Sequence, residues 1–201
     1  MNKGWIVLIV LVVIVLALFG QYVGVRNQLV AKDQSVKESW SQVDIVLQRR
    51  ADLIPNLVET VKGYAQQEVT VFGDIAKARS ALLSAGTPSQ KIAANGQLDG
   101  AIGRLLLIVE NYPQLKSNEN FMRLQDELAG TENRIAVERK RYNDTLKDYN
   151  TYVLLFPNNL YAGFAGFKQN PAYFEASEAS RQTPKVDFSA KPAAPAAAPA
   201  H

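Results

Sequence analysis

An uninterrupted apolar run near the amino terminus limits the possible folds more than any other feature of the chain. WIVLIVLVVIVLALF, from Trp5 to Phe19, contains no polar residue, and in its flanks, Gly4 and Gly20 to Val25, only Gln21 is polar. About 20 apolar residues in helical form cross the ~30 Å hydrocarbon core of a bilayer. Residues 1–24 are therefore predicted to form a single transmembrane anchor.

A cleaved signal peptide is the competing interpretation of this run. Signal peptides usually have a shorter apolar region and a small-x-small cleavage site. The segment ALFGQYVG offers no good Ala-x-Ala match, and the chain has no cysteine that could carry a lipid. These observations favour a retained span in a bacterial inner membrane.

The charges around the span bear on its orientation. Lys3 precedes the span, whereas Arg26, Lys32 and Lys37 follow it closely. The positive-inside rule places the following domain in the cytoplasm, but a large domain can translocate against so small a difference, and the orientation stays open. The net charge of +3 comes from 22 basic and 19 acidic residues and is too small to indicate nucleic-acid binding.

After the span, apolar residues recur three and four apart over long distances, with few strand signals. Phe121, Leu128, Ile135, Tyr142, Tyr149 and Phe156 are all seven apart. A second row combines Leu29, Val36 and Val43 with Trp40, Leu47 and Ile54. Heptad spacing indicates long helices crossing at about +20°, as in bundles and coiled coils. The sequence predicts an all-α fold: the transmembrane helix, then an up-and-down antiparallel four-helix bundle of long helices.

Local signals mark the predicted helix ends. Thr87-Pro88-Ser89-Gln90 has the composition of a capping box with proline at the first helical position, and it should begin the third helix. Ser117 or Asn118 should cap the fourth helix.

Pro55 lies in the middle of the first apolar rhythm, within RRADLIPNLV. Proline lacks an amide hydrogen, and its ring clashes with the carbonyl of the residue four before it, which costs about 3 kcal/mol inside a helix. The rhythm nevertheless continues in phase across Pro55, as a kinked continuous helix would require. We predict a turn at Pro55, because a break there gives four helices of similar length, whereas an unbroken helix would leave much of its apolar seam uncovered.

The predicted domains follow from these boundaries. Residues 1–24 form the anchor, 25–156 the bundle, 157–188 an aromatic-rich extension packing on the membrane-proximal end, and 189–201 a disordered tail. The tail includes KPAAPAAAPAH, which has too little bulk to fold.

Several of these segments resemble the LemA family of bacterial single-span membrane proteins. The matching segments are YVGVRNQLV, WSQVDIVLQRRADLIPNLVETVKGYAQQE, ALLSAG, LLLIVENYPQLKSNENFMRLQDELAGTENRIAVERKRYNDTLKDYNTYVLLFP and YFEAS, within residues 22–188. The resemblance implies a helical bundle on a membrane anchor and says little about chemistry. Family members commonly have histidine where this chain has Gln67, so no role of that histidine carries over.

The residue inventory argues against an enzyme. Di-iron sites in helical bundles use Glu-x-x-His pairs, but the chain has a single histidine, His201, and no such pair. The same count excludes a histidine general base and a Ser-His triad. We predict no catalytic residue, no metal and no cofactor.

Four ionisable residues fall on apolar seam positions and form a candidate polar seam. They are Asp33, Arg50, Glu68 and Glu138. Buried charges are usually paired, and a pair can fix helix register. The hypothesis is an ion pair of Arg50 with Glu68, or of an arginine with Glu138. In the alternative, which we weigh more heavily, each residue lies at a seam edge with its charged group in water.

If the helices alternate in direction, the turns at Pro55 and at Tyr112-Pro113 lie together at the end farthest from the membrane. Loops on a rigid scaffold often carry binding residues. We predict a partner-binding tip there, with simple turn chemistry as the alternative. Its candidate residues are Arg49, Arg50, Asp52, Pro55, Asn56, Tyr112, Pro113, Lys116 and Asn118.

The opposite end carries FPNNLYAGFAGF, residues 156–167. Aromatic rings concentrate at the membrane–water boundary. The candidate interface aromatics are Phe156, Tyr161, Phe164 and Phe167. Covering the open end of the bundle core is the competing explanation, and it is the one we favour.

These features together predict a membrane-anchored, non-catalytic scaffold of the bacterial envelope that docks an unidentified envelope protein through its tip. Homo-oligomer formation stays open, and nucleic acid is not expected. The alternatives are a lipid- or stress-responsive regulator at the membrane surface and an accessory subunit of a membrane peptidase.

Overall fold

The computed structural model describes residues 3–175; the predicted tail, residues 189–201, and the last part of the predicted extension, residues 176–188, lie outside this range. The described residues form helices and contain no strand, which confirms the all-α prediction. The helices are α1 (Lys3–Lys62), α2 (Val69–Ser84), α3 (Pro88–Val109), α4 (Pro113–Lys116), α5 (Glu119–Leu154) and α6 (Asn158–Ala165).

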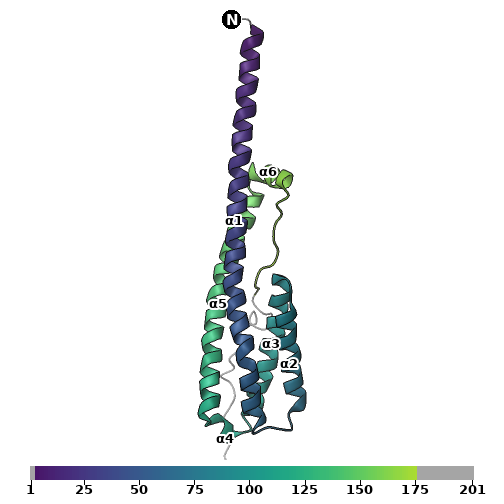
Figure 1. Ribbon diagram of the computed structural model, residues 1–201, viewed down its shortest axis with the longest axis vertical. Coiled ribbons are helices and arrows are strands. Elements are labelled where there is room, and N and C mark those ends of the chain that lie inside the picture. The colour runs from purple at the N-terminus through teal and green to yellow at the C-terminus, as the bar shows by residue number, and fades with distance from the viewer. Residues whose placement is uncertain (1–2, 176–201) are drawn as a thin grey trace, which may run out of the picture.

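Helix α1 runs the whole length of an elongated molecule (Figure 1). Its amino-terminal part stands free, whereas α5 packs along the rest of it. Helices α2 and α3 form a hairpin beside the lower part of α1, and α4 closes the end farthest from the amino terminus. From α1 to α2, α3 and α5 the chain reverses direction each time.

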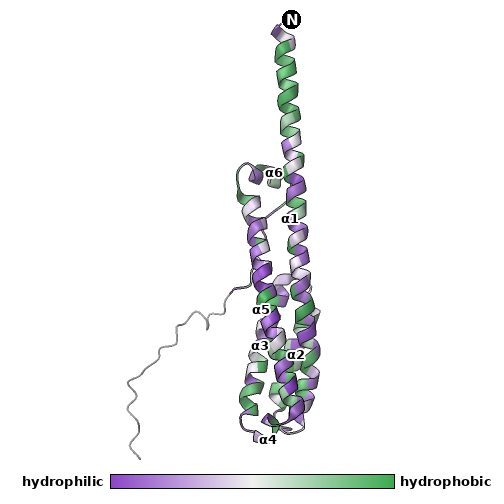
Figure 2. Ribbon diagram, turned by 90° about the vertical axis from the view of Figure 1, so that its left-hand side faces the viewer, coloured by the Kyte–Doolittle hydropathy of each residue, from purple (hydrophilic) through white to green (hydrophobic). Residues whose placement is uncertain are grey.

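The free part of α1 is the apolar run, which Figure 2 shows as the most hydrophobic stretch of the molecule. Both α1 and α3 have the length and composition of a membrane span. No residue in the apolar window of α1 is buried, whereas Leu98 and Leu105 of α3 lie in the core. Helix α3 is therefore a core helix, and α1 is the candidate span.

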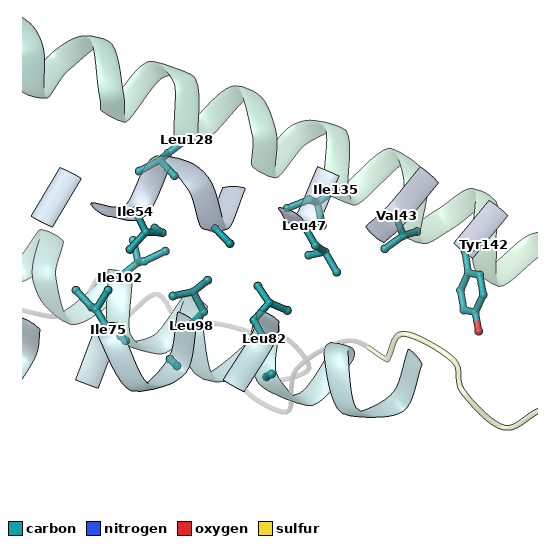
Figure 3. Close-up of a cluster of buried hydrophobic side chains, with 14 of the residues drawn as sticks. Val43, Leu47, Ile54, Ile75, Leu82, Leu98, Ile102, Leu128, Ile135 and Tyr142 are labelled. Carbon is teal, nitrogen blue, oxygen red and sulfur yellow. The ribbon is translucent and has the colours of Figure 1, made fainter. Parts of the chain in front are cut away.

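The core lies between α1, α5 and the hairpin, and the heptad rows supply it (Figure 3). Val43, Leu47 and Ile54 of α1 face Ile135 and other seam residues of α5, with side chains of α2 and α3 completing the cluster. The row that begins at Phe121 is buried at every heptad position through Tyr149. It fails at Phe156, which is exposed because α5 ends at Leu154.

The predicted turn at Pro55 is wrong, because Pro55 lies inside α1 and the helix continues to Lys62. Proline leaves the carbonyl of Ala51 without its helical donor. Arg79 of α2 supplies the donor instead, since its Nε atom lies 2.7 Å from the Ala51 oxygen. A break at Pro55 was also expected because a longer helix would leave its apolar seam uncovered. That expectation fails because α5 covers the seam of α1 above the hairpin.

As a result, the turn that follows α1 occupies residues 63–68, and α2, with 16 residues, is much shorter than predicted. The other boundaries agree with the local signals. Thr87 and Gln90 form the expected capping box at the start of α3. The Asn118 side chain accepts a hydrogen bond from the Phe121 amide and caps α5.

Candidate partner-binding tip and buried charge cluster

Two loops meet at the end of the molecule farthest from the amino terminus, and we call them the distal tip: residues 63–68 and residues 110–118, with α4 inside the second (Figure 1). Side chains join the two loops. Asn118 Nδ2 donates to the Tyr64 hydroxyl at 3.1 Å, and Gln67 Nε2 approaches the Tyr112 hydroxyl at 3.4 Å. Each loop also contributes a buried apolar residue, Ala65 from the first and Leu115 from the second. The tip is therefore tied together from both loops.

A shallow concavity of about 680 Å³ lies beside the tip, between the end of α1 and the start of α2. Val69, with 70% of its surface exposed, and Phe72 give it an apolar side. Lys62 pairs with Glu59 at 2.8 Å, and its ammonium lies 5.8 Å from the centre of the Phe72 ring. An exposed apolar residue beside a fixed charge is a combination that can bind a protein surface.

The structure separates the predicted tip residues into two groups. Tyr112, Pro113, Lys116 and Asn118 lie in the distal tip. Arg49, Asp52, Pro55 and Asn56 lie on the exposed side of α1, more than one turn before its end, and Arg50 is buried. The cause is the continuity of α1 through Pro55, which moves the turn to Gly63. Glycine just after a helix is a common stop signal, and Gly63 could have located the turn.

The charged group of Arg50 is buried between three helices, with 7% of the residue exposed. Its Nη1 atom lies 2.5 Å from Asp99 Oδ1 of α3 and 2.7 Å from Glu132 Oε2 of α5. Asn95 Nδ2 donates to the other oxygen of Asp99 at 3.0 Å, and Arg139 Nη2 lies 3.8 Å from the same oxygen. We call these five residues the charge cluster.

The charge cluster balances two guanidinium groups against two carboxylates. Nη1 of Arg50 lies within ion-pair distance of both carboxylates, yet its N–H bonds are not aligned with either oxygen. Imperfect alignment lowers the net stability that a buried pair contributes. The cluster therefore disfavours arrangements of α1, α3 and α5 that separate Arg50 from both carboxylates while it stays buried, because those leave an uncompensated charge.

Neither interpretation of Arg50 matches the structure, because its charged group is buried rather than in water and its partners are Asp99 and Glu132 rather than Glu68. Arg50 lies about 18 Å before the end of α1 at 1.5 Å per residue, and Glu68 lies beyond that end, in the distal tip. Glu138 is half-buried on α5, and its Oε2 atom has no hydrogen-bond partner within residues 3–175. Asp33 pairs with Lys37 of its own helix at 2.7 Å. Sequence reasoning missed Asp99 because it lies beside the seam of α3.

Above the hairpin, residues 167–174 return along α1 and α5, and we call this segment the return strap (Figure 1). Two asparagines of α5 hold it. The Asn150 side chain donates to the carbonyl and accepts from the amide of Asn170, both at 2.8 Å. Asn143 forms the same pair of bonds with Phe174, at 2.8 and 3.0 Å.

The strap also completes an aromatic cluster in which Tyr142 is fully buried. Its ring contacts those of Trp40 and Phe174, with centroids 5.2 and 5.9 Å apart. Burial, with a smaller contribution from Tyr173, raises the pKa of Tyr142 to about 12. The hydroxyl has no hydrogen-bond partner within the described residues.

The four candidate interface aromatics divide into an inward and an outward pair. Tyr161 and Phe167 pack against the core, and Tyr161 also donates to Gln21 of α1 at 3.3 Å. Phe156 and Phe164 point outward, with 79% and 86% of their surfaces exposed. Covering the core accounts for the inward pair and leaves the outward pair unexplained.

Residues 39–188 match the sequence pattern of the LemA family. The chain belongs to the LemA family. This match confirms the resemblance drawn from the motifs. Among its relatives, "Protein LemA" of Metamycoplasma hominis is 25% identical and aligns over 80% of this chain and 73% of its own length.

Other relatives of this LemA-family chain are named as magnetosome proteins. "Magnetosome protein MamQ 2" of Paramagnetospirillum magneticum is 27% identical and aligns over 76% of this chain. "Magnetosome protein MamQ" of Magnetospirillum gryphiswaldense is 24% identical over 80% of this chain and 69% of its own length. The chain spans 65% of the length of the Paramagnetospirillum relative.

Within residues 3–175, no group of three or more histidine, cysteine, aspartate or glutamate side chains is placed to hold a metal ion. The charge cluster contributes only two carboxylates, and both face Arg50. Its chemistry in this LemA-family fold is that of an ion pair.

Proposed function

We propose that this LemA-family protein is a membrane-anchored, non-catalytic scaffold of the bacterial envelope that docks an envelope protein through its distal tip. In this proposal residues 1–24 are the anchor, residues 25–156 act as an up-and-down antiparallel four-helix bundle, and residues 157–188 pack near the membrane. Relatives named Protein LemA and magnetosome protein MamQ support a membrane-associated protein of the bacterial envelope or magnetosome.

The observation that carries the proposal is that hydrogen bonds join the two loops of the distal tip. Binding surfaces gain affinity when their side chains are held in place before the partner arrives. Tyr64, Gln67, Tyr112 and Asn118 are joined across two loops, and exposed Val69 lies beside them. A turn whose only task is to reverse the chain does not require four side chains to bond across it.

Site-specific photocrosslinking tests the proposal in the native membrane. A photoreactive residue at Val69 should give a discrete crosslinked protein, because this position faces the concavity. Val137, an apolar residue of α5 with 65% of its surface exposed, is the matched control and should not give that product. Equal products at both positions, or none at Val69, would exclude a tip-specific partner.

The same experiment separates the alternatives. A lipid-responsive regulator should not depend on the distal tip, so the double variant Tyr64→Ala with Tyr112→Ala would leave its crosslinked products unchanged. A docking scaffold should lose its crosslinked partner in that double variant. An accessory subunit of a membrane peptidase predicts that the partner is the peptidase, which mass spectrometry of the product would identify.

A further inference from the structure

A group of large apolar side chains lies exposed where α5 gives way to α6. The residues are Leu154, Leu155, Phe156, Leu160 and Phe164, and we call them the apolar foot. Each has more than half of its surface exposed. Several exposed apolar side chains gathered in one short stretch mark a surface that is covered in the working protein, unlike single exposed apolar residues such as Val137.

The position of the foot along α1 is fixed by contacts. Tyr161 of α6 donates to Gln21, and its ring lies 6.1 Å from that of Tyr22. Gln21 is the first polar residue after the apolar run. The foot therefore lies beside the point at which the candidate span reaches polar surroundings, and Figure 1 shows α6 against α1 at that level.

Figure 1 also shows that α6 turns away from the direction of α5 and lies beside α1 rather than continuing the rod. A rod that stands on its span would present such a helix to the membrane surface. Two exposed basic residues suit anionic headgroups: Arg26 lies four residues after Tyr22, which contacts Tyr161 of α6, and Lys168 lies three residues after the end of α6. The hydropathy colouring in Figure 2 places α6 just below the hydrophobic stretch.

We propose that the apolar foot inserts into the interfacial layer of the same bilayer that holds the span, giving the protein a second contact with lipid. This inference rests on the membrane anchoring in the proposed function and is independent of the tip. Interfacial helices bury their apolar faces about 5–10 Å into the headgroup and acyl boundary. Phe156 and Phe164 supply that depth, while Tyr161 and Phe167 hold α6 to the rod.

The alternative occupant of the foot is a second copy of the chain. Continuity with the span favours lipid, because the foot and the span meet the membrane boundary together. A dimer contact would need no alignment with Gln21. The experiment must therefore distinguish lipid from protein as the cover of the foot.

The absence of cysteine from the chain makes single-cysteine labelling possible on the full-length protein. An environment-sensitive fluorophore is attached to Phe164→Cys, to Leu11→Cys in the span, and to Val137→Cys on α5, three exposed apolar positions. Val137 lies about 26 Å along α5 from Leu154. Each protein is reconstituted into vesicles of zwitterionic and anionic phospholipid that carry nitroxide quenchers at shallow or deep acyl positions.

The expected result is quenching of the Phe164→Cys label mainly by the shallow nitroxide, quenching of the Leu11→Cys label mainly by the deep one, and little quenching at Val137→Cys. A quenched Leu11→Cys label with an unquenched Phe164→Cys label would overturn the foot and leave the anchor intact. An apolar environment at Phe164→Cys without lipid quenching would indicate a second copy and overturn the inference.

Two further outcomes are equally decisive. Quenching at Val137→Cys as strong as at Phe164→Cys would mean that the rod lies flat on the membrane, and the foot would not be a separate contact. No quenching at Leu11→Cys would refute the anchor on which the inference and the proposed function both rest.

Discussion

The contact between Arg79 and the Ala51 carbonyl makes a quantitative prediction about Pro55. Proline at position 55 deprives that carbonyl of its helical donor, and Ala51 is fully buried. Arg79 Nε is the replacement at 2.7 Å. Arg79→Met should therefore leave a buried carbonyl unpaired, which costs about 1–3 kcal/mol of unfolding free energy.

The same substitution should cost much less when Pro55 is replaced by alanine. Residue 55 would then have an amide hydrogen and could donate to Ala51 within the helix. Arg79 would lose only its contact with Asp52, a 4.0 Å pair in which the Asp52 side chain is 57% exposed and the Arg79 side chain 32% exposed, and pairs open to solvent contribute about 0–1 kcal/mol. The two substitutions should thus be coupled by about 1–2 kcal/mol.

Urea unfolding of the full-length protein in detergent micelles measures this coupling. The chain has two tryptophans, so Trp5→Phe leaves Trp40, which packs against Tyr142 in the core, as the only tryptophan reporter. Arg104→Met is the matched control, because Arg104 is exposed on α3 and pairs only with Asp74 among the described residues. An equal cost of Arg79→Met in both backgrounds would refute the role assigned to Arg79.

Three further predictions concern the charge cluster, the buried tyrosine and the return strap. Asp99→Asn combined with Glu132→Gln leaves the buried Arg50 without a counterion and should lower the unfolding free energy by about 3 kcal/mol. Arg50→Met should lower it by only about 1 kcal/mol, because both carboxylates can turn to water. Urea unfolding measures both losses, and a larger loss for Arg50→Met would contradict the account of the cluster. Tyr142→Phe removes an unpartnered buried hydroxyl and should be neutral or stabilising by up to about 1 kcal/mol. Burial raises the pKa of Tyr142 from 10.0 to about 12, so between those pH values the unfolded chain loses the proton while the folded protein keeps it. The unfolding free energy of the wild type is unaffected by this group below pH 10, and from pH 10 to 12 it should fall more steeply than that of Tyr142→Phe. Asn150→Ala should speed hydrogen exchange at the Asn170 amide about tenfold or more and leave the Phe174 amide unchanged, because Asn150 accepts from the Asn170 amide. Asn143→Ala should speed exchange at the Phe174 amide and leave the Asn170 amide unchanged. Exchange that rises equally at both amides in either variant would show that the strap is released as a unit.

The helices were predictable because their evidence is local and periodic. The heptad row through Leu128, Ile135 and Tyr142 needed only spacing, and the caps at Thr87 and Asn118 needed only neighbouring residues. The apolar run gave the candidate span in the same way.

What the sequence could not supply are the contacts between distant residues. Pro55 was wrongly predicted to break α1. The hydrogen bond that replaces the one lost at the Ala51 carbonyl comes from Arg79, in a different helix, and cannot be read from the residues around Pro55. For Arg50 the sequence favoured a charged group in water, with a Glu68 pair as the other hypothesis. The structure shows a buried pair with Asp99 of α3 instead, and no spacing rule connects those two residues. The return strap has no apolar periodicity, and its bonds come from asparagines that sequence patterns do not distinguish from surface residues.

The continuity of α1 has a mechanical consequence for a protein held in a bilayer. From Arg26 to Lys62 the helix spans about 54 Å without a joint, at 1.5 Å per residue. The distance of the tip from the lipid is thus fixed by the number of residues in this part of α1. The direction in which Val69 and Tyr64 face is likewise set by the rotation of the span about its own axis. A neighbouring helix that rotated the span would therefore rotate the tip by the same angle.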